Sequence, residues 1–387
     1  RAPGTQNTTA RTQARKVKTF TMPTAQQQLT DLFSQLIDEG SEWGVQLMAY
    51  HHGECVVDIA MGVMDDQSKQ PVTKETLFPV FSVSKGFMAT LIHKLASDGK
   101  LDYEMPIADI WPEFAAVHKE KSAITIKHVM SHVSGMQFMP MGIGMTEFCN
   151  WDAMCDAIAK QKPANAPGEV MEYHAITYGF LLGEVARRID GRSVSAMLQD
   201  EIALPLGLEN ELFMGIPADV EKRVATLMHI FDDGQPVVDD SIPQAIPGWT
   251  QPLHQMMNQS TARQSCSPGS GGIMTARAIA RHYASLLPGG VDGVQLLDDQ
   301  RMDTVTTEQY PHLDGNNRFG LGYTYSPVTY TDGSTCLQFG HGGFGGAQGF
   351  ADRTCELAVG FTHNLYCSAH QGEQIKSTLR EALGLPV

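Results

Sequence analysis

The sequence lacks both a long apolar run and an excess of basic residues. No apolar stretch approaches the roughly 20 residues that a membrane-spanning helix needs, so no membrane span is predicted. Lysine and arginine number 28 against 43 aspartates and glutamates, which gives a formal net charge of -15 in 387 residues. This balance argues against a nucleic-acid partner and against an anionic membrane surface, because both require a dominant basic face.

Closely spaced cysteines are also missing. The seven cysteines are far apart, odd in number and contain no C-x-x-C pair, which argues against a disulfide framework and a zinc site. A reducing, cytoplasmic location is the simpler expectation. The first 20 residues hold five basic residues, no acidic residue and no apolar core, unlike an intact secretory signal. We therefore expect residues 1–21 to form a disordered tail.

Several common catalytic motifs are absent as well. No Gly-x-Ser-x-Gly elbow occurs, which disfavours an α/β-hydrolase. Ser270 lies among glycines and is expected to belong to a tight turn. His128 and His132 are four apart, but no glutamate follows His128, so we expect them to be structural rather than zinc ligands. We expect neither a metal nor a cofactor.

The hydrophobic pattern predicts strands at both ends of the chain and helices between them. Residues 23–38 have apolar side chains at helical spacing, and residues 44–62 are typical of two strands around a turn at His52 and Gly53. Further helices are predicted at 85–99, 177–189, 193–202 and 369–383, and strands at 337–340, 349–352 and 357–362. If the terminal strands pair, the helical part is inserted into one α/β domain.

Ser82 and Lys85 carry the most chemical information. Their spacing of three places them on one face of a helix. A serine hydroxyl is a weak nucleophile until a base removes its proton, and a lysine acts as that base only if burial or nearby positive charge lowers its pKa. Taken alone, the pair fits a serine that caps the helix and a solvated lysine better than it fits a catalytic pair.

The surroundings of this pair resemble a known family. The matching segments occur in order from about residue 25 to 385 and include residues 78–86, 99–102, 106–114, 124–136, 167–168, 172–175, 179–191, 205–208, 268–283 and 339–352. Together they resemble the serine β-lactamase and penicillin-binding-protein-like superfamily, and within it the family VIII carboxylesterases.

The resemblance implies a role for each matching residue. Ser82 corresponds to the acylated serine, Lys85 to the lysine beside it, and Tyr173 to the tyrosine that shares proton transfer. We expect a Tyr173 phenolate, favoured by the lysine cation, as a proton acceptor. The third motif corresponds to His341, Gly342 and Gly343 on an edge strand. The oxyanion hole is then expected from the backbone N–H groups of Ser82 and Phe344.

Two positions depart from the β-lactamase pattern. Ala175 stands where β-lactamases have an asparagine that holds a substrate amide, and His341 stands where they have a lysine that attracts a carboxylate. Histidine is mostly neutral at pH 7. These changes favour neutral esters over β-lactams, although His341 is equally consistent with a structural role.

We therefore expect an α/β (α+β) fold of the class C β-lactamase type, with an antiparallel sheet flanked by helices and an all-helical region. The predicted domains are residues 22–84 with 262–387, and residues 85–261. The predicted function is a serine carboxylesterase for small-molecule esters with short to medium acyl chains. Three alternatives remain open: a β-lactamase or D-amino-acid peptidase or amidase, an acyltransferase, and a non-catalytic, self-assembling relative. The oligomeric state is not predicted.

Overall fold

The structure is a computed structural model that describes residues 23–229, 238–313, 318–366 and 371–387. The predicted tail lies outside these ranges. No helix among the described residues combines the length and the apolar character that crossing a membrane requires.

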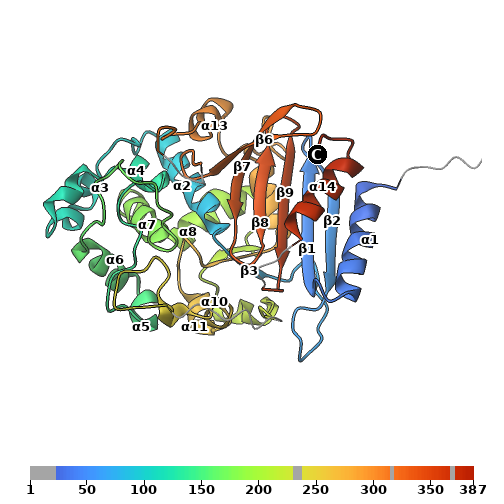
Figure 1. Cartoon of the computed structure of the whole chain (residues 1–387), viewed down its shortest axis with the longest axis horizontal. Coiled ribbons are helices and arrows are strands. Elements are labelled where there is room, and N and C mark those ends of the chain that lie inside the picture. The colour runs from blue at the N-terminus through green and yellow to red at the C-terminus, as the bar shows by residue number, and fades with distance from the viewer. Residues whose placement is uncertain (1–22, 230–237, 314–317, 367–370) are drawn as a thin grey trace, which may run out of the picture.

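Strands from both ends of the chain form one antiparallel sheet (Figure 1). Its order is β2-β1-β9-β8-β7-β6, and β1 pairs with β9 from Val45 opposite His363 to His51 opposite Leu357. The strands are β1 (Gly44–His51), β2 (Glu54–Gly62), β6 (Thr324–Thr329), β7 (Thr335–Gly342), β8 (Gln348–Asp352) and β9 (Leu357–His363). The predicted pairing of the two terminal strand regions is confirmed, and the domain boundaries stay a prediction.

A smaller sheet, in the order β3-β5-β4, lies beside the first. Its strands are β3 (Phe78–Phe81), β4 (Leu212–Met214) and β5 (Gly272–Met274). They were not predicted, because three or four buried residues are too short to show a strand alternation. Strand β7, which carries His341, was predicted to be an edge strand, but β6 pairs with it from Thr335 to Gly340. His341 itself lies one residue beyond that pairing.

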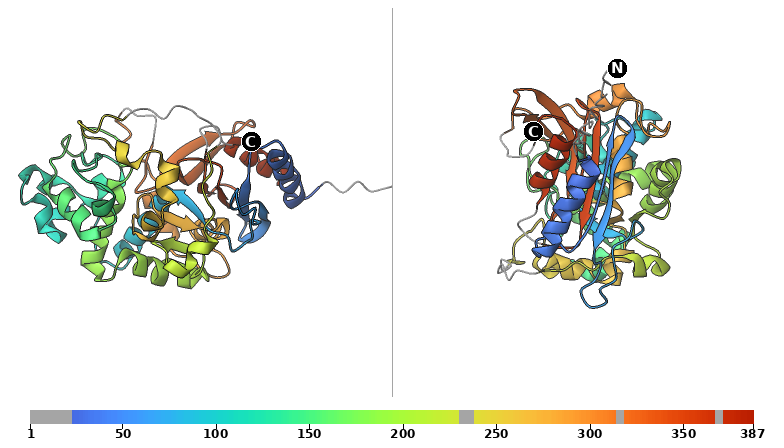
Figure 2. Two further views of the ribbon diagram at one scale, coloured as in Figure 1. Left: turned by 90° about the horizontal axis from the view of Figure 1, so that it is seen from below. Right: turned by 90° about the vertical axis from the view of Figure 1, so that its right-hand side faces the viewer.

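Helices cover both faces of the large sheet (Figure 2). Helices α1 (Ala25–Asp38) and α14 (Gly372–Ala382) pack on one face, where Leu29, Phe33 and Leu36 join the sheet in one apolar cluster. Thr24 caps α1 by accepting a hydrogen bond from the Gln27 N–H. On the other face, α12 (Ala276–Ala284) contacts β1, β8 and β9.

Most of the remaining helices lie on the side of the large sheet that is farthest from β2 (Figure 1). Helix α2 (Ser84–Ser97) is buried along nearly its whole length and packs against α7 (Thr177–Asp190). The other α-helices are α3 (Ile107–Ile110), α4 (Ile126–Met130), α5 (Met145–Phe148), α6 (Trp151–Lys160), α8 (Val194–Leu198), α9 (Leu204–Leu206), α10 (Leu253–Met257), α11 (Ser260–Gln264) and α13 (Asp299–Val305). The predicted helices at 85–99 and 177–189 are confirmed.

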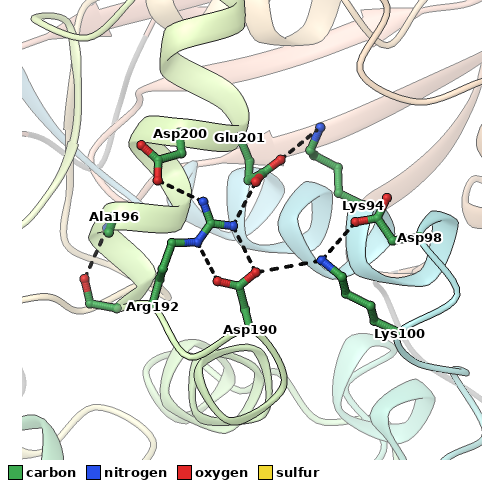
Figure 3. Close-up of polar contacts among 9 residues, drawn as sticks. Lys94, Asp98, Lys100, Asp190, Arg192, Ala196, Asp200 and Glu201 are labelled. Carbon is green, nitrogen blue, oxygen red and sulfur yellow. Dashed lines mark hydrogen bonds and ion pairs between the residues drawn. The ribbon is translucent and has the colours of Figure 1, made fainter.

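A charged cluster joins the ends of α2 and α7 to the π-helical turn at Gln199–Ala203 (Figure 3). Arg192 pairs with Asp190 through Nε at 2.5 Å and with Asp200 and Glu201 at 2.8 Å each. Lys94 on α2 reaches Glu201 at 3.4 Å. The Asp190 side chain is only 6% exposed, so Arg192 neutralises a carboxylate with little access to water.

Replacement of Arg192 by alanine should lower the free energy of unfolding by about 1–2 kcal/mol, because three carboxylates lose their shared guanidinium. Hydrogen bonding to Arg192 holds the pKa of Asp190 below its ordinary value. A depressed folded-state pKa stabilises the fold at neutral pH, and this contribution is lost as the pH falls through it. Urea unfolding at neutral and acidic pH measures both effects. Lys69→Ala, which removes an exposed pair with Asp66, is the control with a change within about 0.5 kcal/mol.

Candidate active site

Ser82 lies in the tight connection between β3 and α2. The residue before it, Phe81, has a positive φ of 46°, a conformation that is costly for a bulky side chain. The Ser84 hydroxyl donates to the Phe81 carbonyl and accepts from the Gly272 N–H at 2.8 Å. The second serine of the motif thus holds the backbone in the conformation that presents the first.

The same geometry excludes the reading in which a serine caps the helix and Lys85 is solvated. Val83 is the N-cap residue of α2, and no side chain caps this end. Lys85 has no exposed surface at all. Lys85 therefore makes its contacts with other residues of the protein and not with solvent.

The Lys85 ammonium nitrogen contacts three oxygen atoms from different segments. Nζ lies 3.1 Å from the Ser82 Oγ, 2.7 Å from the Ala175 carbonyl and 2.6 Å from the Gly269 carbonyl. Gly269 belongs to the 268–272 segment that was expected to be only a tight turn. Its carbonyl is a functional contact that no side-chain motif could have revealed, whereas Ser270 itself bonds to Ser267 at 3.0 Å.

Burial lowers the pKa of Lys85 well below its ordinary value, since the charged form loses its hydration. A neutral amine has two N–H donors and one lone pair. The carbonyls of Ala175 and Gly269 only accept hydrogen bonds, so they take both donors. The lone pair is then left facing the Ser82 hydroxyl, which is the arrangement of a base with its nucleophile.

Tyr173 lies in the loop before α7, four residues ahead of the helix. Its ring centroid is 4.7 Å from the Lys85 Nζ, and its hydroxyl is 3.3 Å from the His341 Nε2. Burial raises the pKa of Tyr173, and a hydrogen bond with Ser82 opposes this only in part. The expected phenolate is therefore not the resting form, and Tyr173 is a phenol.

His341 is neutral and has a defined tautomer. Burial lowers the pKa of its imidazole to about 3. Nδ1 lies 2.7 Å from the Gly342 carbonyl, which can only accept, so Nδ1 carries the proton. Nε2 is then an acceptor, and the Tyr173 hydroxyl donates to it. His341 thus orients the phenol and brings no positive charge to the site.

His132 forms a platform under Tyr173 that the sequence did not reveal. Its ring lies 4.7 Å from the Tyr173 ring and 4.4 Å from that of Phe319. Its Nδ1 accepts the His174 N–H at 3.0 Å, which ties the Tyr173 loop to residue 132. The expected structural role of His132 agrees with these contacts, but the residue lies directly at the site.

Two backbone N–H groups next to the nucleophile have no acceptor in the part of the chain that the structure describes. They belong to Ser82 and Phe344. Gly343 brings the two segments together, because a Cβ on it would lie 2.2 Å from the Val80 carbonyl oxygen. The rings of Phe81 and Phe344 are 6.4 Å apart. Free amides on two segments that meet near the nucleophile are suited to hold a developing oxyanion.

The described residues contain no group of three or more His, Cys, Asp or Glu side chains placed to hold a metal ion. The functional groups that meet here are instead a serine, an amine, a phenol and two amides. A model of the family described as Beta-lactamase matches residues 29–379. The chain belongs to this family.

Relatives of this β-lactamase-family chain carry more than one description. The esterase/beta-lactamase LipL of Mycobacterium tuberculosis is 29% identical over 341 residues, which cover 83% of this chain and 77% of LipL. A crystal structure of a family VIII carboxylesterase has a TM-score of 0.81 at 29% identity and covers 92% of this chain and 96% of its own. A class C β-lactamase has a TM-score of 0.69 at 19% identity over 93% and 96%. The predicted class C β-lactamase-like α+β fold is confirmed.

Ser84→Ala should destabilise the fold by about 1–3 kcal/mol, because it leaves the Phe81 carbonyl and the Gly272 N–H buried without their shared partner. Chemical unfolding measures this change. Ser377→Ala on α14 is the matched control, since its hydroxyl bonds to the Glu373 carbonyl at the surface. Equal effects of the two substitutions would show that the hydrogen bonds of Ser84 to Phe81 and Gly272 add nothing special to the stability of the fold.

Proposed function

We propose that this chain is a serine hydrolase of the carboxylesterase type, acting on short-to-medium acyl esters through a Ser82 acyl-enzyme. One observation carries the proposal. The Ser82 Oγ lies 3.1 Å from a fully buried Lys85 amine whose other two directions are occupied by carbonyl oxygens. An uncharged amine held in this way is a general base directed at a single hydroxyl.

In acylation, Lys85 accepts the Ser82 proton as Oγ attacks the ester carbonyl carbon. The carbonyl oxygen becomes an oxyanion and receives hydrogen bonds from the N–H groups of Ser82 and Phe344. When the C–O bond to the alcohol breaks, the departing alkoxide takes a proton from Tyr173. The Lys85 ammonium then restores the proton of Tyr173.

In deacylation, a water molecule attacks the acyl carbon while Lys85 accepts one of its protons. Oγ departs as the acyl–oxygen bond breaks and recovers a proton from the Lys85 ammonium. The products are the free carboxylic acid and the starting enzyme. Tyr173, held by His341 and packed on His132, keeps its proton through this step.

The polar groups at positions 175 and 341 support an ester substrate over a β-lactam. Ala175 offers its backbone carbonyl to Lys85, and its methyl side chain has no group that binds an amide. His341 is uncharged and so gives a substrate carboxylate no cation. The family resemblance implies that β-lactamases use an asparagine and a lysine at these two places.

An aromatic surface next to the predicted oxyanion hole supports an apolar acyl group. Phe344 is 56% exposed, and its ring lies 6.4 Å from Phe81 and 5.5 Å from Tyr366. The ring contacts of Tyr173 involve other residues, namely His132, Phe319 and His341. Because Tyr173 must face the departing alcohol, the acyl group is left to the Phe344 side.

The names of the relatives agree with an esterase and keep a second candidate open. LipL is named as both esterase and β-lactamase, and a structural neighbour is a family VIII carboxylesterase. A β-lactamase or amidase would use the same Ser82, Lys85 and Tyr173. A non-catalytic relative would have no need for the buried base.

Ser82 should react with a fluorophosphonate probe. The protein should hydrolyse p-nitrophenyl butyrate faster than it hydrolyses nitrocefin or a D-alanyl dipeptide. Ser82→Ala should abolish labelling and hydrolysis, because the nucleophile is gone. Mass spectrometry locates the label, and absorbance follows each substrate. Ser270→Ala, which alters a nearby serine that bonds to Ser267, is the control that retains both activities. Faster turnover of either amide sinks the esterase assignment, and labelling of Ser82→Ala sinks the nucleophile.

The rate of ester hydrolysis should rise with pH along an acidic limb whose midpoint lies well below the ordinary lysine pKa of 10.5. The limb rises because the neutral form of Lys85 is the base, and burial favours that form. Lys85→Arg should lower kcat/KM by at least about 10³-fold, since a guanidinium stays protonated. The pH profile of kcat/KM measures the limb. A midpoint at or above 10 contradicts the assignment of Lys85 as base.

A further inference from the structure

The loop that carries the Phe344 amide is a tight turn rich in glycine. The Gly346 N–H donates to the Gly343 carbonyl at 3.1 Å, and Gly345 has a φ of +88°. A hydrogen bond between the first and fourth residues with a positive φ at the third is typical of a type II turn. Phe344 is its second residue. Three glycines in four residues give this turn little rigidity of its own.

A buried pair on the far side of the turn holds its third residue. The His363 Nε2 lies 2.8 Å from the Gly345 carbonyl, and its Nδ1 lies 2.9 Å from the Glu42 carboxylate. Glu42 is 1% exposed and His363 is 4% exposed. His363 ends β9, whereas Glu42 lies between α1 and β1, so two rigid parts of the sheet domain meet at the turn.

The hydrogen-bond pattern requires one proton to be shared by this pair. The Gly345 carbonyl can only accept, so His363 must carry a proton on Nε2. A proton must also lie between Nδ1 and Glu42, on the imidazole or on the carboxyl group. If that proton leaves, the Glu42 charge faces a lone pair on Nδ1. The ring then gains by moving its remaining proton to Nδ1, and the bond to Gly345 is lost.

We propose that Glu42 and His363 are positioning residues for the oxyanion hole, and that the proton they share keeps the Phe344 amide in place. This inference rests on the proposed function, because it gives the Phe344 amide the task of binding the oxyanion. It adds a role for two residues that belong to no motif of the sequence and lie behind the turn.

The surroundings of His363 leave Glu42 as its charged partner. The Phe361 ring, on the same strand, lies 5.0 Å away, and Val45 is the paired residue on β1. The Tyr366 ring packs against Gly345 on the turn, 2.9 Å from where a Cβ would lie. The attraction of Glu42 raises the pKa of His363 in spite of its burial. The shared proton is therefore lost at a pH above the ordinary histidine value of 6.5.

Two matched variants separate positioning from mere stability. In a Glu42→Gln background, which removes the buried charge, His363→Gln keeps an amide donor near the place of Nε2. His363→Asn keeps one near the place of Nδ1 and cannot reach Gly345. Both lose the imidazole and should lower the melting temperature similarly. The readouts are the rate of fluorophosphonate labelling of Ser82, and kcat and KM for p-nitrophenyl butyrate.

The asparagine variant should lose roughly 10- to 100-fold in labelling rate and in kcat, because the amide that receives the oxyanion is displaced. The glutamine variant should stay within about threefold of Glu42→Gln alone, given the retained donor. KM should change little in either. Equal rates for the two variants overturn the proposal, as does a loss that follows only the melting temperature.

The pH profile supplies a second arm. Wild-type protein should show an alkaline limb in kcat, and Glu42→Gln should remove it, because a glutamine amide can donate to Nδ1 without a titrating proton. An unchanged alkaline limb overturns the shared-proton role. If wild-type protein is labelled at Ser82 but hydrolyses no ester, the proposed substrate class fails while the labelling rates still test this inference. An unlabelled wild type overturns both.

Discussion

The chemistry that we propose depends on the confinement of one amine. Lys85 has no exposed surface, and two carbonyl oxygens fix the direction of its hydrogen bonds. A lysine in water is a cation that strips no proton from serine. Removal of its hydration turns the same side chain into a base, and the carbonyls of Ala175 and Gly269 turn that base toward Ser82. The roles that we propose for the other groups in the site require this amine to be neutral.

The groups around Lys85 preserve that neutrality. Tyr173 is a phenol, His341 is an uncharged imidazole that accepts from it, and His132 is an uncharged ring packed beneath. The described residues of the site are hydrogen-bond donors and acceptors, and none of them brings a fixed anion or cation into contact with the nucleophile. This lack of charge is one reason why we propose an uncharged ester as the substrate. The Glu42–His363 pair keeps its charges on the far side of the turn.

The sequence predicted the parts that depend on side-chain identity and ordered motifs. Ser82, Lys85 and Tyr173 could be predicted because the family resemblance extends over most of the chain. The terminal strands could be predicted because their apolar patterns are long enough. The sequence could not reveal contacts made by backbone atoms, such as that of the Gly269 carbonyl, because every residue has a backbone carbonyl. The protonation of Tyr173 was predicted wrongly because burial, which outweighs the lysine charge, is a property of the folded chain. The contact of His363 with the turn at Gly345 could not be predicted either, because it depends on strand pairing between segments that are distant in the sequence.

The two carbonyls that enclose Lys85 lie 90 and 184 residues further along the chain. During synthesis, Ser82 and Lys85 therefore leave the ribosome before the segments that enclose Lys85 have been made. Strand β9, which pairs with β1, is made later still. In that interval Lys85 is a hydrated cation and Ser82 an ordinary alcohol. The reactivity that we propose for Ser82 therefore requires that segments far along the chain have folded around Lys85.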